Sequence, residues 1–96
     1  MFKIMNIFGV YILQSLKNGK YYIGSTNNIS CRLDEHNLRL VFATKFIKPL
    51  ELKVFIDCDD LRSARISEYR LKKYKNKKIL DKVIISGIFP WKYRGV

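Results

Sequence analysis

The sequence predicts a small α+β fold: a three-stranded antiparallel sheet flanked by helices, in the order β-β-α-(α)-β-α-α. Two strand-like runs flank an Asn18-Gly19 pair, and a third such run covers residues 50–57. Segments with a helical repeat of apolar residues follow the second and third runs. Because three strands cannot bury both faces of their sheet alone, the helices must pack against it.

The first two strands are predicted over residues 9–16 and 20–25, which are rich in β-branched and aromatic side chains. Asn18-Gly19 between them is typical of a two-residue type I′ turn. Residues 50–57 begin with alternating apolar and polar side chains, as a half-buried strand does.

A two-residue turn would set Tyr11 opposite Thr26. Tyr11 and Tyr22 would then project from one face of the sheet, about 13 Å apart along the strands, and a different loop length would bring them closer. Gly24, on the same face, would leave a gap where another group can approach. The alternative is that both tyrosines pack against helices, with their hydroxyls at the rim.

The first helix is predicted to begin after Asn28, an N-cap residue, because apolar side chains and a histidine then recur at helical spacing. These residues are Ile29, Leu33, His36 and Leu40. Residues 39–49 fit either a short helix or a loop that ends at Pro49.

A long helix is predicted from Asp59 or Asp60 to about Lys75, and a shorter one over residues 78–85 that ends at Gly87. The tail from Phe89 onward mixes aromatic and basic side chains without a period. It would either cover the edge of the sheet or stack on unpaired bases.

The chain of 96 residues predicts a single domain over 1–96, and its apolar content excludes a disordered chain. Cys31 and Cys58 have neither the spacing nor the histidine partners of a zinc site, which favours reduced cysteines in an intracellular protein. No run approaches the roughly 18 apolar residues of a membrane span. We therefore expect a cytoplasmic protein without a membrane partner.

The formal net charge of +11 comes from 19 Lys and Arg against eight Asp and Glu. Self-repulsion of this size destabilises a compact chain, so it favours a polyanionic partner, most commonly nucleic acid. The alternative is a generic basic surface. The lysines expected to grip a phosphate backbone without reading its sequence, unless they form only a solvated face, are Lys72, Lys73, Lys75, Lys77 and Lys78.

Two polar residues of the first predicted helix, Arg32 and His36, share the sheet-facing side with its apolar residues. A buried charge is costly unless it is paired, so this placement suggests a site. The structural alternative is an arginine that reaches solvent at the edge and a hydrogen-bonded core histidine.

Glu68 is the only acid among eight Lys or Arg residues between positions 61 and 78, and helical spacing puts it on the apolar side. It would serve either as a metal ligand or as the partner of Arg32. We expect Tyr11, Tyr22, Arg32, His36 and Glu68 to share one face of the sheet, and Tyr11 and Glu68 on opposite faces would contradict this arrangement.

These residue types are suited to cutting a phosphodiester bond. An arginine stabilises charge that develops on phosphate, a metal polarises the phosphate, and a phenol transfers a proton. A free tyrosine has a pKa near ~10, and neighbouring cations favour the phenolate.

The order Gly9-Val10-Tyr11, Tyr22-Ile23-Gly24, Arg32, His36 and Glu68 resembles the GIY-YIG nuclease superfamily, over about residues 8–80. In detail the chain is similar to small stand-alone members described as excision-repair-subunit-like, which share an N-x-x-x-R-x-x-x-H-N stretch and a T-x-x-x-x-P-x-x-L segment. Here these run from Asn28 to Asn37 and from Thr44 to Leu52. Residues 81–96 would form a C-terminal helix and tail outside the motifs.

The resemblance implies metal-dependent cleavage of DNA, with Mg²⁺ or, as an alternative, Mn²⁺. By resemblance, Tyr11 would activate the attacking water, Tyr22 would support the water or phosphate, and Arg32 would stabilise the transition state. Glu68 would hold the metal, and His36 would assist proton transfer or position Tyr11.

The chain departs from some members of the superfamily at two points. Ser25 stands where some have a lysine, so its contact with phosphate would be weaker. Asn76 does not have the spacing of an asparagine that many members carry after the glutamate.

The main hypothesis is therefore a DNA endonuclease with low sequence specificity, acting on branched, flapped or single-stranded DNA and directed by a protein partner or by none. One alternative is a catalytically weak nucleic-acid-binding module, or a subunit of a DNA repair or mobile-element complex. Another is a basic RNA-binding protein.

Overall fold

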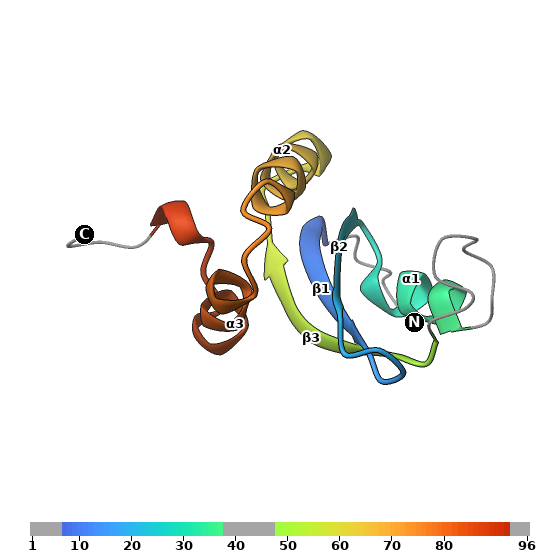
Figure 1. Cartoon of the computed structure of the whole chain (residues 1–96). Helices are drawn as coiled ribbons and strands as arrows, with labels where there is room; N and C mark the ends of the chain where they lie inside the picture. The colour runs from blue at the N-terminus through green and yellow to red at the C-terminus, as the bar shows by residue number, and fades with distance from the viewer. Residues whose placement is uncertain (1–6, 38–47, 93–96) are drawn as a thin grey trace, which may run out of the picture.

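The structure is a computed structural model that describes residues 7–37 and 48–92. Its elements are β1 (Gly9–Ser15), β2 (Tyr21–Thr26), α1 (Ile29–Asn37), β3 (Leu50–Asp57), α2 (Leu61–Lys72), α3 (Lys77–Ser86) and the short 3-10 helix η2 (Pro90–Lys92) (Figure 1). The strands form one antiparallel sheet in the order β2-β1-β3. This confirms the predicted α+β class. The predictions for Leu40, for Thr44 and for most of segment 39–49 lie outside the described residues.

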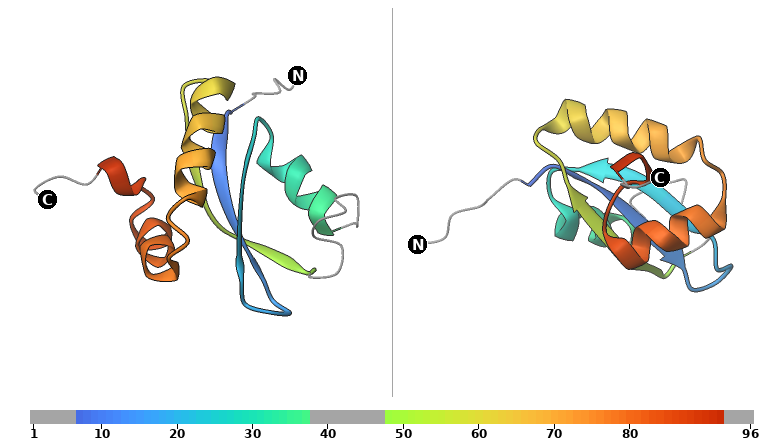
Figure 2. Two further views of the ribbon diagram at one scale, coloured as in Figure 1. Left: turned by 45° about the horizontal axis from the view of Figure 1, so that its top comes forward. Right: turned by 90° about the vertical axis from the view of Figure 1, so that its left-hand side faces the viewer.

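Helices cover both faces of the sheet, with α1 on one face and α2 and α3 on the other (Figures 1 and 2). Side chains alternate along the central strand β1, so its neighbouring residues belong to different cores. Tyr11 and Leu13 are buried on the α1 face. Val10 and Ile12 are buried on the other face, where Leu71 of α2 joins them.

The hairpin turn is longer than predicted. β1 and β2 pair so that Tyr11 lies opposite Gly24, and the Ser15 amide donates to the Lys20 carbonyl over 3.0 Å. The buried Ser15 hydroxyl accepts hydrogen bonds from the amides of Lys17 and Asn18, each 3.1 Å long, and these bonds stabilise the wider turn. The prediction of a two-residue turn was therefore wrong, because the Ser15 side chain of the strand takes part in the loop.

This register shift of two residues keeps every side chain on its predicted face. Tyr22 pairs with Leu13, so Tyr11 and Tyr22 are offset by two residues rather than four. The two tyrosines share the α1 face, and the offset along the strands falls to about 7 Å.

The N-termini of α1 and α2 are set by their N-cap residues. The side chains of Asn28 and Asp60 accept the amides of Cys31 and Ser63, at 3.1 and 2.7 Å, so α1 and α2 begin where predicted. The long helix ends at Lys72, three residues earlier than expected.

The early end of α2 and the start of α3 have a common cause. Lys75 has φ 47°, which no α-helix accommodates, and the Asn76 side chain caps α3 by accepting the amide of Lys78. Gly87, with φ 71°, ends α3 as predicted. Asn76 therefore has a structural role in this fold.

Phe89, beyond α3, is buried in the core of the α2–α3 face, and Trp91 packs against it. In residues 7–37 and 48–92, no helix is both long and apolar enough to cross a membrane.

Candidate active site

A groove of about 700 Å³ passes around the edge strand β2. Strand β2 contributes five consecutive residues, 21–25, whose side chains alternate between the two faces of the sheet. The predicted site residues that line this groove are Tyr11, Tyr22, Ser25, Arg32, His36, Glu68, Lys72 and Lys75.

The site residues do not share one face of the sheet, so that prediction was wrong. Tyr11 lies on the α1 face, whereas Glu68 belongs to α2, on the opposite face, and contacts Ser25 of β2 there. Both faces of so small a sheet need a helical cover, so α1 and α2 were forced onto opposite sides. Tyr11 and Glu68 nevertheless line the same groove, because β2 is an edge strand around which the groove can pass.

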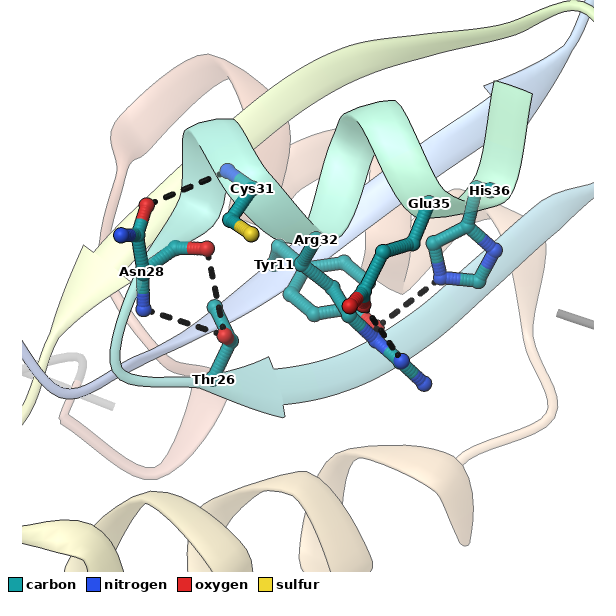
Figure 3. A network of polar contacts seen from close by, with 7 residues as sticks. All are labelled: Tyr11, Thr26, Asn28, Cys31, Arg32, Glu35 and His36. Carbon is teal, nitrogen blue, oxygen red and sulfur yellow. Dashed lines mark hydrogen bonds and ion pairs between the residues drawn. The ribbon is translucent and has the colours of Figure 1, made fainter. Parts of the chain in front are cut away.

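Three of the residues meet at the hydroxyl of Tyr11 (Figure 3). Arg32 Nε donates to Tyr11 Oη over 3.2 Å, and His36 Nε2 lies 3.2 Å from the same oxygen. Both partners come from α1, one helical turn apart, so a single helix face positions them over the strand. Tyr11 is 3 % exposed and His36 5 %, whereas the Arg32 side chain is 38 % exposed, so the cluster joins a buried pair to a cation at the surface of the groove.

The protonation state of His36 follows from its surroundings. Burial, with the nearby Arg32 cation, lowers the pKa of His36 below its ordinary value, although Glu35 opposes the shift. A neutral imidazole is therefore favoured near pH 7. Arg32 only donates, which leaves the Tyr11 proton available for His36 Nε2, and this nitrogen accepts it when the imidazole is in its Nδ1-protonated tautomer.

Gly24 does not leave the predicted gap for an external group. A Cβ atom at this position would collide with the hydroxyl and ring of Tyr11, its cross-strand neighbour. The space beside Gly24 is therefore filled by Tyr11, which can lie flat across the strand only because position 24 lacks a side chain.

Glu35 is a neighbour of the site that the sequence reasoning missed. Its carboxylate pairs with Arg32 Nη1 over 3.0 Å, three residues along α1 (Figure 3). The hydrogen bond to Tyr11 raises the pKa of Arg32 above its ordinary value, burial opposes the shift, and the hydrogen bond to Glu35 adds to it, so the guanidinium stays charged. The i to i+3 spacing of an acid after Arg32 was the available signal.

Glu68 therefore is not the partner of Arg32. Ser25 Oγ donates to Glu68 Oε1 over 2.5 Å, and Lys72 Nζ lies 2.5 Å from Glu68 Oε2. The Glu68 side chain is 20 % exposed, so its carboxylate lies at the boundary between the core and the groove. Ser25, predicted to contact phosphate, lines the groove and holds this carboxylate there.

The oxygen groups at Glu68 fit a divalent metal ion. In the described part of the chain, no group of three or more acidic, histidine or cysteine side chains could hold one. Mg²⁺ does not require such a cage, because it is often held by one or two carboxylates, with water and substrate phosphate as its other ligands. The Glu68 carboxylate already attracts a cation into the groove, the Lys72 ammonium, and its hard oxygens suit Mg²⁺ or Mn²⁺.

The remaining predicted residues have partners other than the cluster around Tyr11 and the Glu68 carboxylate. The Tyr22 hydroxyl accepts a hydrogen bond of 3.1 Å from Asn18 at the hairpin turn, rather than pointing at Tyr11. Lys73 lies over the ring of Tyr69, and Lys77 over that of Tyr21. Lys78 is exposed in the first turn of α3.

Arg65 is a cation that the sequence reasoning did not single out. It lines the groove three residues before Glu68, on the same side of α2. With Lys72 and Lys75 it gives the α2 wall of the groove a positive charge, which suits a phosphate backbone.

The comparison with protein families agrees with this geometry. The model of the GIY-YIG catalytic domain matches residues 7–81 of the 96-residue chain, a span that contains every residue of the cluster around Tyr11 and the Glu68 carboxylate. Neither the curated proteins nor the solved structures gave a match. Members of this family are generally endonucleases that use divalent metals and act on DNA. The chain belongs to the GIY-YIG superfamily.

Proposed function

We propose that this protein is a metal-dependent endonuclease that hydrolyses DNA phosphodiester bonds with low sequence specificity. The observation that carries the proposal is the Tyr11 hydroxyl, held between Arg32 and His36 in the same groove as Glu68. A proton acceptor, a fixed cation and a carboxylate at one groove are the groups that phosphodiester hydrolysis needs.

In this proposal Tyr11 is the general base. Its hydroxyl proton passes to His36 Nε2, 3.2 Å away, as the phenol oxygen takes a proton from the attacking water. The water oxygen forms a bond to phosphorus while the bond from phosphorus to the leaving sugar oxygen breaks, and the leaving oxygen takes a proton from solvent water. The neutral state of His36, which its burial favours, suits this transfer.

Arg32 stabilises the charge on the phosphate. Its Nε and Nη1 donate to Tyr11 and Glu35, which fixes the plane of the guanidinium. The guanidinium has five N–H donors in all, so others remain to bind phosphate oxygens.

Glu68 would hold the divalent metal, with Ser25 orienting the carboxylate. The metal, when bound, supplies a Lewis acid that polarises the phosphate. Lys72 would release Glu68 Oε2 and turn toward the DNA backbone, as its 51 % exposed side chain allows.

Low sequence specificity is proposed because the cations of the groove recognise phosphates, which are the same at every base pair. DNA repair and a protein partner for targeting fit this activity, as does a cytoplasmic location. All of these remain proposals.

The decisive test is DNA cleavage with and without metal. Purified protein is incubated with supercoiled, branched, flapped and single-stranded DNA in Mg²⁺ or Mn²⁺, and in parallel with excess EDTA. We expect cleavage in metal and none in EDTA. Tight binding to DNA without cleavage in any metal would contradict the proposal and support the binding module. Tighter binding to RNA than to DNA at equal salt would support the RNA-binding alternative.

The basic residues between α2 and α3 and in α3 give a separate prediction. Lys75→Gln and Lys78→Gln, made as two separate variants, should each weaken binding to duplex DNA about equally for every sequence. Each should also flatten the slope of log K against log salt by up to about 0.9 for each lost phosphate contact. Binding titrations over a range of salt measure this slope. Lys53→Gln, on the far edge strand β3 beside Glu51, is the control and should not change it. An equal change of this slope in the Lys75, Lys78 and Lys53 variants would mean that the lysines act through the net charge of the protein and not through contacts with phosphate.

A further inference from the structure

The outer side of α2 carries exposed aromatic and cationic side chains in contact with one another. Tyr69 is 63 % exposed, and Lys73 Nζ lies 4.4 Å from the centre of its ring. Farther around the helix, the Arg70 guanidinium lies 4.0 Å from the centre of the Trp91 indole, which in turn stacks on the buried Phe89. We call Tyr69, Arg70, Lys73 and Trp91 the α2 ledge.

The α2 ledge adjoins the candidate active site. Arg65 and Lys72, which line the groove, precede and follow Tyr69 by four and three residues. Residues at these spacings are neighbours on a helix surface. A chain that leaves the groove over α2 would therefore pass these two cations and reach the ring of Tyr69.

The charge of this surface selects the kind of occupant. Glu68 is the only acid of α2, and it points into the groove. The exposed cations of the helix and its C-cap residue are Arg62, Arg65, Arg70, Lys72 and Lys73. An occupant that complements them must be anionic and must also offer flat apolar faces to Tyr69.

A single strand of nucleic acid meets both conditions. Its phosphates match the cations, and the faces of its unpaired bases can stack on an aromatic ring. A duplex meets only the first condition, because its bases are already stacked on one another. Arg70, which lies over Trp91 at the outer end of the stack that begins at Phe89, extends this binding surface. The plane of a guanidinium group can also stack on bases.

We propose that the α2 ledge binds an unpaired strand of nucleic acid where it leaves the groove, with Tyr69 stacking on a base. This inference rests on the proposed nuclease function in assigning the strand to its substrate. The preferred substrate is then DNA with an unpaired segment beside the cleaved bond, as in a flap or a branch.

The test compares binding of unpaired and paired DNA. The probes are a fluorescent oligothymidylate of about 16 nucleotides, the upper end of common single-strand site sizes, and a blunt duplex. Fluorescence anisotropy should show about 5- to 150-fold weaker binding of the oligothymidylate by Tyr69→Ala, corresponding to the loss of one stacked base. Duplex affinity should stay within about twofold.

Two further variants separate stacking from general effects. Tyr69→Phe keeps the ring and should bind like the unchanged protein. Ile85→Ala removes an apolar side chain that is 86 % exposed on α3 and is not one of the ledge residues, and it should have no effect. Equal affinities of Tyr69→Ala and Tyr69→Phe for the oligothymidylate, or an equal loss on the duplex, would overturn the proposal. Self-association lost in Tyr69→Ala, with oligothymidylate affinity unchanged, would assign the ledge to protein contacts and overturn it too.

This binding test does not depend on catalysis. If the unchanged protein cleaves no DNA in any metal, the nuclease assignment fails, and the anisotropy comparison of Tyr69→Ala with Tyr69→Phe still tests strand binding by the ledge. If cleavage requires Glu68 but Tyr69→Ala cuts flapped DNA and supercoiled duplex in the original ratio, the nuclease stands and the ledge is overturned as a substrate site.

Discussion

Glu68→Ala is expected to abolish DNA cleavage, with a loss of at least about 1,000-fold. The substitution removes the one carboxylate that α2 presents to the groove. Electrostatic stabilisation by a metal in an active site contributes several kcal/mol to the transition state, and each 1.36 kcal/mol is a factor of ten in rate. Initial rates of cleavage of supercoiled DNA in Mg²⁺ measure the loss, and the affinity for Mn²⁺ should fall in parallel.

The fold should tolerate the loss of Glu68. Its partner Lys72 is half exposed and can be solvated, and Ser25 loses only one acceptor. Glu51→Ala is the control, because this exposed acid lies on β3, away from the groove, and its pair with Lys53 is at the surface. A thermal unfolding curve should show both variants folded. Cleavage by Glu68→Ala within tenfold of the unchanged protein would remove this carboxylate from the mechanism.

Tyr11→Phe is expected to slow cleavage by about 10²- to 10⁴-fold, the usual contribution of a general base. The phenyl ring would keep its packing beside Gly24 and in the core of the α1 face. Only the hydroxyl that joins Arg32 and His36 is removed. The rate of cleavage at saturating DNA, measured with the DNA affinity, separates loss of chemistry from loss of binding.

A stability cost must be distinguished from this catalytic effect. Leaving the Arg32 and His36 nitrogens without the phenol oxygen should cost about 1–3 kcal/mol of unfolding free energy. Denaturant titration measures that cost, and Tyr74→Phe, which alters a tyrosine stacked near Trp91 outside the groove, controls for the substitution itself. If Tyr11→Phe cleaved at the original rate, another group would have to be the base.

Much of the fold could be predicted from local patterns. The strand runs around Asn18-Gly19 and the caps at Asn28 and Asp60 depend on neighbours within a few residues, so they could be recognised in the sequence. Even with the wrong turn length, Tyr11 and Tyr22 were assigned to the same face, because a shift of two residues conserves the alternation of a strand.

The wider hairpin turn could not be predicted in the same way. It depends on the hydroxyl of Ser15, a strand residue whose burial is decided by Leu50 and the rest of the sheet. The role of Gly24 follows from this register, since only the true pairing brings the Tyr11 ring across it.

The sequence by itself determined the residue types of the candidate site and the local elements that carry them. Periodicity assigned Glu68 to the inner side of α2 and Arg32 and His36 to the inner side of α1. Only the tertiary structure decided that these two sides face opposite surfaces of the sheet and meet around β2. The physical reason is that helical periodicity defines which side of a helix is buried, whereas the sheet face that it covers depends on how all the layers share a small core.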